Sequence, residues 1–152
     1  MADVPDDASY MRVALALATE AASQSEVPVG AIVVHKFEII GRGFNQPISR
    51  SDPSAHAEIV ALRAAGRRMR NYRLTDAALF VTLEPCLMCL GAIFQARVGR
   101  LVFGAMDPKA GACGGVIDLC AEQKLNHHTQ VTGGVLAEPC ADLLRQFFRA
   151  RR

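Results

Sequence analysis

The chain has 152 residues, of which 51% are hydrophobic and 21% are charged, and its formal net charge is +2. This length allows one full hydrophobic core but not two, so we expect a single domain over residues 1–152. So small a net charge does not by itself indicate a nucleic-acid-binding protein, and the apolar stretches end before they reach the length of a membrane helix. Because the first residues are acidic and unlike a signal peptide, we expect a cytoplasmic protein.

Hydrophobic spacing alternates between that of helices and that of strands along the whole chain. Strands alternating with helices predict an α/β domain with three layers. The expected elements are a helix capped by Asp6 or Asp7 and ending near Ser23, a hairpin of strands over 30–34 and 39–44, a loop over 45–53, a helix over 54–68, a strand over 78–82, a helix from Cys86 to about Arg97, a strand over 101–104, a short helix over 116–121, a strand over 129–132 and a helix over 138–149.

Two short motifs have the residue types of a metal centre: His56 with Glu58, and Pro85 before Cys86 and Cys89. The two cysteines are three residues apart, so at a helix start both sulfurs lie within reach of one ion. With His56 they make three ligands, which leave a fourth tetrahedral position for water, as in catalytic zinc sites. Glu58 does not share a helix face with His56, so we expect it to be the base beside that water rather than a ligand.

A closed structural zinc site is the alternative interpretation of the same motifs, and it requires a fourth ligand. The candidates are Cys113, Cys120, Cys140, His35, His127 and His128. None is paired with another ligand at close metal-binding spacing, so the open, catalytic site is favoured. The odd number of cysteines and their irregular spacing argue against a disulfide framework, and the three remaining cysteines are expected to be small buried or loop residues.

Further short segments of the chain have distinctive sequences. They are Glu26–Ala31, Asp52–Glu58, Asn71–Leu74, Val81–Cys89, Phe103–Ala105, Leu125–His127 and Phe147–Arg149. Together with the His-x-Glu and Pro-Cys-x-x-Cys pattern of zinc nucleobase deaminases, they resemble the bacterial tRNA-specific adenosine deaminases over nearly the whole chain. The resemblance implies a three-layer αβα cytidine-deaminase-like fold, with a five-stranded mixed sheet, in a homodimer of zinc-dependent nucleobase deaminase domains.

The resemblance also implies an activity: hydrolytic deamination of adenosine to inosine at the wobble position, A34, of a tRNA anticodon stem-loop, by zinc-activated water. It implies one Zn²⁺ per chain, no organic cofactor and no membrane. The residues carried over by position are His56, Cys86 and Cys89 as zinc ligands, Glu58 as proton shuttle, Asn45 on the purine ring, the N–H of Ala57 facing the base, Asp107 on the ribose, Lys109 on phosphate, and Phe148 in a final helix that holds the anticodon loop.

Three alternative interpretations of these residues and of the function remain open. Asp107 and Pro108 also fit an ordinary turn. A free-base guanine or cytosine deaminase would use the same zinc chemistry. It differs by lacking the features assigned to RNA, which are Asp107, the final helix and two clusters of arginines: Arg63, Arg67, Arg68, Arg70 and Arg73 in one segment, and Arg145, Arg149, Arg151 and Arg152 at the C-terminus. A non-catalytic tRNA-binding subunit with structural zinc is the third alternative, but it would not need the carboxylate of Glu58.

Overall fold

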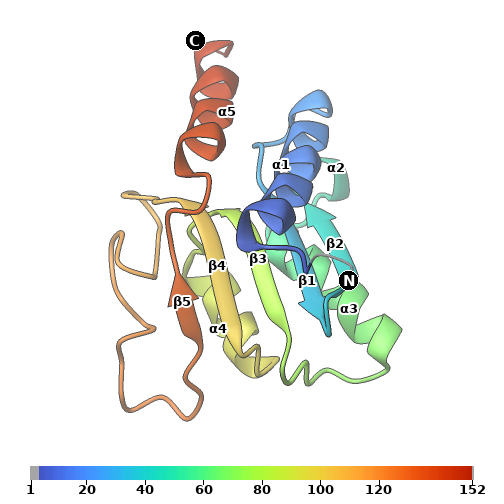
Figure 1. The fold of residues 1–152 in the computed structure, drawn as a ribbon. Helices are drawn as coiled ribbons and strands as arrows, with labels where there is room; N and C mark the ends of the chain where they lie inside the picture. Colours follow the sequence, from blue (N-terminus) through green and yellow to red (C-terminus); the bar gives the residue numbers. More distant parts are fainter. Residues whose placement is uncertain (1–3, 152) are drawn as a thin grey trace.

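The computed structural model describes residues 4–151. Five strands form one sheet in the order β2-β1-β3-β4-β5, in which β1 is antiparallel to β2 and β3, while β3, β4 and β5 are parallel (Figure 1). The strands are β1 (Gly30–His35), β2 (Glu38–Phe44), β3 (Ala78–Leu83), β4 (Arg100–Ala105) and β5 (Gln130–Thr132), and the helices are α1 (Asp7–Ser23), α2 (Pro47–Arg50), α3 (Ala57–Met69), α4 (Leu87–Gln95) and α5 (Ala137–Arg149). The predicted five-stranded mixed sheet is confirmed.

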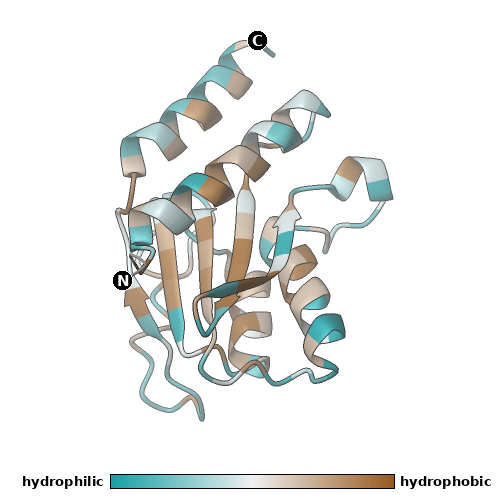
Figure 2. Ribbon diagram, turned by 45° about the vertical axis from the view of Figure 1, so that its right-hand side comes forward, coloured by the Kyte–Doolittle hydropathy of each residue, from teal (hydrophilic) through white to brown (hydrophobic). Residues whose placement is uncertain are grey.

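Helices cover both faces of the sheet, because successive strand residues point to opposite faces. In β1, Ile32 and Val34 lie in the core beneath α1 with Met11, whereas Val33 lies in the core beneath α3 and α4 with Leu62. The central strands are therefore mostly apolar, and they lie between helices that combine polar and apolar residues (Figure 2). The predicted three-layer architecture follows from this burial on both faces.

Two glycines of β2 let α3 lie directly on the backbone of the sheet. A Cβ atom on Gly41 would stand 2.4 Å from the carbonyl oxygen of Ala61, and one on Gly43 would stand 2.5 Å from that of Ala57. Both distances are well inside van der Waals contact, so only glycine fits. The first turn of α3, and with it His56, is thereby held against the end of β2.

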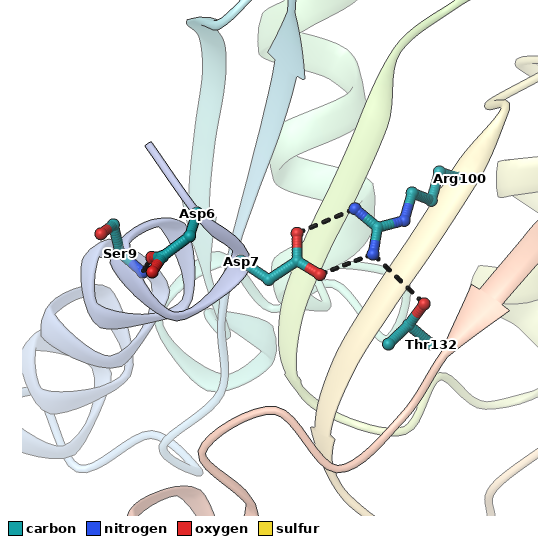
Figure 3. Close-up of polar contacts among 5 residues, drawn as sticks. All are labelled: Asp6, Asp7, Ser9, Arg100 and Thr132. Carbon is teal, nitrogen blue, oxygen red and sulfur yellow. Dashed lines mark hydrogen bonds and ion pairs between the residues drawn. The ribbon is translucent and has the colours of Figure 1, made fainter. Parts of the chain in front are cut away.

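The start of α1 is fixed by two neighbouring aspartates with different tasks. Asp6 is the N-cap, since its carboxylate accepts a hydrogen bond of 2.8 Å from the N–H of Ser9. Asp7 instead accepts two hydrogen bonds from Arg100, of 2.8 and 2.5 Å, and Arg100 also donates to Thr132 (Figure 3). This bidentate pair connects α1 to the parallel half of the sheet.

The helix expected from Ser54 begins three residues later, at Ala57. Ser54 is instead held in a turn by Asp52, whose carboxylate accepts hydrogen bonds from its N–H at 2.8 Å and its Oγ at 2.7 Å. His56 is the N-cap of α3, with extended backbone, and only Glu58 lies in the first turn. A helix over 54–68 places both His56 and Glu58 in its first turn, and this prediction is wrong for His56 because the aspartate turn competes with the helix.

The loop expected over 45–53 contains one turn of helix, α2. Proline at its first position favours a helix start, and Glu26 accepts hydrogen bonds from the N–H groups of Ile48 and Ser49 at 3.2 and 2.7 Å. The carboxylate comes from more than 20 residues away in sequence. Such a long-range partner has no local sequence signal, which is why the turn was missed.

The short helix expected over 116–121 is absent from the structure. This segment folds back on the glycine-rich loop, where the N–H of Val116 donates to the oxygen of Gly111 and the N–H of Leu119 donates to the oxygen of Ala112. These contacts take the backbone groups that a helix would have used internally. The prediction was wrong because the loop supplied stronger partners than local helix formation.

Candidate active site

The metal-binding motifs meet where α3 and α4 begin. His56 is the N-cap of α3 and Cys86 is the N-cap of α4, and neither side chain caps its own helix. Cys89 lies in the first turn of α4 and is fully buried. Both side chains at the N-caps are thus free to turn toward a shared point, near the positive ends of two helix dipoles.

The three side chains fit a zinc ion. The Nδ1 atom of His56 lies 3.6 Å from the sulfur of Cys86 and 3.3 Å from that of Cys89. Zinc binds thiolate at about 2.3 Å and imidazole at about 2.0–2.1 Å, so tetrahedral geometry separates sulfur from nitrogen by about 3.5 Å. Within residues 4–151, this is the one group of three or more His, Cys, Asp or Glu residues close enough to hold a metal ion. Among the described residues no fourth protein ligand belongs to the group, as an open zinc site requires.

Of the three ligands, Cys86 is the one whose pKa is shifted toward the deprotonated form that binds a metal. A hydrogen bond from Cys89 lowers the pKa of Cys86 to about 4, although burial opposes the change, and His56 acts in the same direction. The same contact raises the pKa of Cys89, to which burial adds. The hydrogen bond with Cys86 raises the pKa of His56. The two sulfurs thus share one proton, which a bound zinc ion replaces.

Glu58 lies beside this group but is not part of it. Its side chain is buried, with 4% exposed, and burial raises its pKa to about 7. A carboxyl group with a pKa near neutrality can both accept and donate a proton at physiological pH. The position and chemistry of Glu58 therefore suit a proton shuttle rather than a fourth ligand.

Asn45 and Ala57 were both expected to face the base, and the structure pairs them with each other. The N–H of Ala57 donates a 2.8 Å hydrogen bond to Oδ1 of Asn45, whose side chain is buried. The backbone of Asn45 is itself held by the oxygen of Val29 at 3.1 Å. The N–H of Ala57 is therefore bound within the protein. Because this hydrogen bond occupies Oδ1 of Asn45, the amide nitrogen of Asn45 is left as the donor that a purine ring nitrogen needs.

The remaining candidates line a groove of about 870 Å³ between the loop after β4 and α5. Asp107, Lys109 and Phe148 all contribute to it, whereas none of the three metal ligands does. Phe148 is 48% exposed, and Phe147 beside it is buried under the guanidinium of Arg151, which lies 3.4 Å from its ring centre. The complete lining is Val27, Leu83, Met106, Asp107, Pro108, Lys109, Leu144, Arg145, Phe148, Arg149 and Arg151.

Asp107 does form the turn that its sequence with Pro108 also fits. Its Oδ1 accepts hydrogen bonds from the N–H groups of Lys109 and Ala110, at 3.0 and 3.2 Å. This is an aspartate turn, which holds the side chain in one orientation. The turn and a contact with substrate are compatible, because a carboxylate has two oxygens and about four acceptor sites.

Two buried carboxylates beside the site were given no role by the sequence motifs. Glu26 is 1% exposed and Glu84 is 2% exposed. Both accept hydrogen bonds from backbone N–H groups distant in sequence, Glu26 from α2 and Glu84 from the loop after β4. Glu26 precedes β1 and Glu84 follows β3, two antiparallel neighbours, so both lie at one end of the sheet. The available signal was a glutamate next to, or two residues before, a proline at a strand end.

The three other cysteines are not metal ligands. The sulfurs of Cys113 and Cys120 lie 3.6 Å apart in the loop beyond β4, and both are partly exposed. Cys140 of α5 is buried against β4, where a Cβ atom on Gly104 would lie 2.4 Å from its sulfur. The expectation of small buried or loop residues is confirmed.

The fold and site together define the class of the molecule: an α/β enzyme with an open zinc site and a buried carboxyl beside it. The sequence pattern of the cytidine and deoxycytidylate deaminase zinc-binding region matches residues 4–105. The chain belongs to this family. No helix of residues 4–151 combines the length and the apolar character needed to span a bilayer.

Comparison with proteins of similar sequence and structure indicates which deaminases this chain resembles. The chain is 51% identical over 147 residues to the tRNA-specific adenosine deaminase of Haemophilus influenzae, which covers 96% of this chain and 85% of the relative. A solved tRNA:A34 deaminase has a TM-score of 0.86 and 38% identity, over 89% of this chain and 98% of the other. A guanine deaminase from Nitrosomonas europaea has a TM-score of 0.78 at 24% identity, covering 97% and 86% of the two chains, which indicates a shared fold only.

Proposed function

We propose that this protein is a tRNA-specific adenosine deaminase that converts adenosine 34, the wobble base of a tRNA anticodon, into inosine. The observation that carries the proposal is the open three-ligand group of His56, Cys86 and Cys89 beside buried Glu58, in a chain half identical to an enzyme of that name. Water and adenosine give inosine and ammonia in this reaction, so no organic cofactor takes part.

Glu58 moves the protons. Bound zinc supplies a Lewis acid that lowers the pKa of water. The carboxylate of Glu58 accepts the proton of that water and donates it to N1 of adenine, which makes C6 electrophilic. After the water oxygen has bonded to C6, Glu58 accepts the remaining proton of that oxygen and donates it to the exocyclic nitrogen. The C6–N bond then breaks to release ammonia and leaves the C6 carbonyl of inosine. Burial supports this role, since a pKa near 7 suits transfer in both directions.

Five other residues position the substrate in this proposal. Asn45 hydrogen-bonds the purine ring, with its orientation set by the N–H of Ala57. Asp107 contacts the ribose and Lys109 contacts a phosphate on one side of the groove, and Phe148 stacks on a base of the anticodon loop on the other. Bases in a loop need less unpairing than bases in a duplex, so a target base can be extruded into the metal site at small cost.

The free-base guanine or cytosine deaminase is the competing proposal, and no observation on this chain favours it. The shared fold of the guanine deaminase reflects a scaffold that hosts several substrates. The arginines that line the groove beside Phe148 have no task in binding a free base, whereas they suit phosphates.

One experiment separates the proposals. Zinc-loaded protein is incubated with an anticodon stem-loop that carries A34, with the same stem-loop carrying G34, and with free adenosine, guanine and cytosine. Inosine, xanthine and uracil are then measured by chromatography. We expect inosine from the A34 stem-loop alone. Turnover of free guanine or cytosine, without inosine in the stem-loop, would contradict the proposal.

We also propose that the enzyme is a single domain over residues 1–152 that works as a homodimer in the cytoplasm, where its tRNA substrate is found. The homodimer rests on the resemblance to the tRNA deaminases. Light scattering of the protein as it elutes from a sizing column measures the mass of the oligomer. The mass expected for a homodimer is twice 16.4 kDa. A mass of one chain at working concentration would contradict it.

A further inference from the structure

Glu84 connects the metal ligands to the loop that carries Asp107. It lies between the end of β3 and Cys86, and only 2% of it is exposed. Its Oε1 accepts a hydrogen bond of 2.9 Å from the N–H of Asp107, and its Oε2 accepts two of 2.8 Å from Cys113 and Gly115. Burying a carboxylate without hydrogen-bond partners costs free energy of folding. The three N–H donors offset this cost and hold the carboxylate of Glu84 in one orientation.

The loop is shaped to close around this carboxylate. A Cβ atom on Gly111 would lie 2.2 Å from Cδ of Glu84, and one on Gly115 would lie 2.7 Å from Oε1. Larger residues at these positions would push the loop away. These two glycines of the loop over 111–115 therefore have a packing reason, since the backbone of the loop approaches Glu84 directly.

Backbone contacts also join the same loop to Pro85 and Cys86, at the start of α4. The N–H of Ala112 donates to the oxygen of Pro85 at 2.9 Å, and Gly111 forms an isolated bridge with Cys86. The loop thus runs alongside the residues that lead into α4. Any shift of the loop relative to Glu84 also changes its distance from the zinc ligands.

Asp107 is fixed at both ends by this arrangement. Its N–H is bound to Glu84, and its side chain accepts hydrogen bonds from Lys109 and Ala110 in the same loop. The side chain has little freedom apart from its backbone, and the backbone is anchored by Glu84. The position of the Asp107 carboxylate relative to Cys86 therefore depends on the carboxylate of Glu84.

We propose that Glu84 is a positioning residue for substrate: it fixes Asp107, on the wall of the substrate groove, at a set distance from the metal centre. This inference rests on the proposed function, in which Asp107 contacts the ribose of the target nucleotide. Glu84 does not touch substrate itself. It acts through Asp107, so the target base reaches the metal only when the loop is anchored.

The decisive variant is Glu84→Gln, which keeps the shape but replaces one acceptor oxygen with an NH₂ group. An amide nitrogen cannot accept a hydrogen bond, so at least one of the three N–H groups loses its partner. We expect one zinc per chain to remain, faster amide hydrogen exchange at residues 107–115, and a rise of about tenfold in KM for the stem-loop, with kcat changed less than KM. Unchanged exchange in this loop would overturn the inference.

A double-mutant cycle with Asp107→Ala distinguishes positioning from mere structural support. If Glu84 acts through Asp107, Glu84→Gln should change KM less than twofold when Asp107 is already alanine. Equal effects in both backgrounds would overturn the positioning role. If Asp107→Ala alone leaves KM unchanged, the ribose contact of the proposed function fails and the inference fails with it, whereas normal zinc content and activity with the A34 stem-loop leave the activity itself intact.

Glu26→Gln is the matched control. Glu26 is equally buried and also accepts backbone N–H groups, but those of Ile48 and Ser49 rather than those of the loop over 107–115. Exchange at residues 107–115 should stay as in the unaltered protein. If Glu84→Gln does not fold, Glu84→Asp replaces it, since it keeps both acceptor oxygens on a shorter arm, and the same Asp107-dependent rise in KM is expected.

Discussion

The metal ligands stand at the starts of two helices against the central sheet, whereas the residues of the groove stand on a loop and on a helix that is largely exposed. Cys89 is fully buried, Glu58 is 4% exposed, and Phe148 in the groove is 48% exposed. In α5 only Cys140 and Phe147 are buried. The chemistry is thus held by the core of the protein, and the proposed RNA contacts are held by its surface.

This difference teaches what each region tolerates. A change at the metal ligands disturbs both the packed starts of α3 and α4 and the binding of the ion, so it also lowers the stability of the fold. A change in the groove removes a proposed contact with substrate and leaves the core intact. Effects should therefore decrease from the ligands to Glu58, then to Phe148, and then to residues that only hold loops.

The largest effect is expected from Cys89→Ala, which removes a buried ligand. The protein should lose its zinc and its deaminase activity and melt at a lower temperature, because the ion links the starts of α3 and α4. Metal analysis and a melting curve measure both. Cys140→Ala is the control, a buried cysteine in α5 that should keep one zinc per chain. A zinc-replete Cys89→Ala protein would disprove the ligand assignment.

Glu58→Ala should separate the chemistry from the metal. We expect zinc content to stay at one per chain while kcat falls by about 10²–10⁴ or more, because general acid–base catalysis is lost. Single-turnover assays on the A34 stem-loop, together with metal analysis, test this. Loss of zinc in this variant would mean that Glu58 is a ligand rather than a proton shuttle.

Phe148→Ala tests the groove. Stacking of a base on an aromatic ring contributes about 1–3 kcal/mol, so binding of the stem-loop should weaken by about fivefold to 150-fold while zinc content and fold are preserved. Fluorescence anisotropy with labelled stem-loop measures the affinity. Phe37→Ala is the control, since Phe37 is 67% exposed on the turn between β1 and β2 and does not line the groove. Unchanged affinity in Phe148→Ala would exclude the stacking role.

Glu26→Gln should have the smallest effect, on stability alone and dependent on pH. Burial raises the pKa of Glu26, but hydrogen bonds from Ser49 and Ile48 outweigh it, so the pKa lies below its ordinary value of 4.5. A lowered folded-state pKa means that the ionised carboxylate stabilises the fold above about pH 4.5, and that this contribution is lost as pH falls through the folded-state value.

Urea unfolding of Glu26→Gln and of the unaltered protein measures this dependence. The free energy of unfolding should be lower in the variant at pH 7, by about 1–2 kcal/mol. The difference between the two proteins should shrink below pH 4.5. A difference that stays constant or grows on acidification would contradict the role of the ionised carboxylate.

Glu26 and Glu58 also show why burial alone does not define a catalytic carboxyl. Both are buried, but the pKa of Glu58 rises to about 7 while that of Glu26 falls. Backbone N–H groups stabilise the anion of Glu26, whereas the surroundings of Glu58 favour its proton. The sequence motif pointed to Glu58 because of its spacing from His56, and it contained no comparable signal for Glu26.

The amino-acid sequence by itself determined the ligand set and the layer architecture. Both depend on local spacing: Cys86 and Cys89 are three residues apart at a helix start, and strands such as 78–82 are apolar except at Thr82 because both faces are buried. The tertiary structure alone decided that α2 forms, that 116–121 does not become a helix, and that Glu84 anchors the loop of Asp107. In α2 and at Asp107 the backbone N–H groups found carboxylate partners more than 20 residues away in sequence, whereas residues 116–121 found partners in the adjacent loop, at Gly111 and Ala112. A buried N–H or carboxylate takes whichever partner the fold brings within hydrogen-bonding distance.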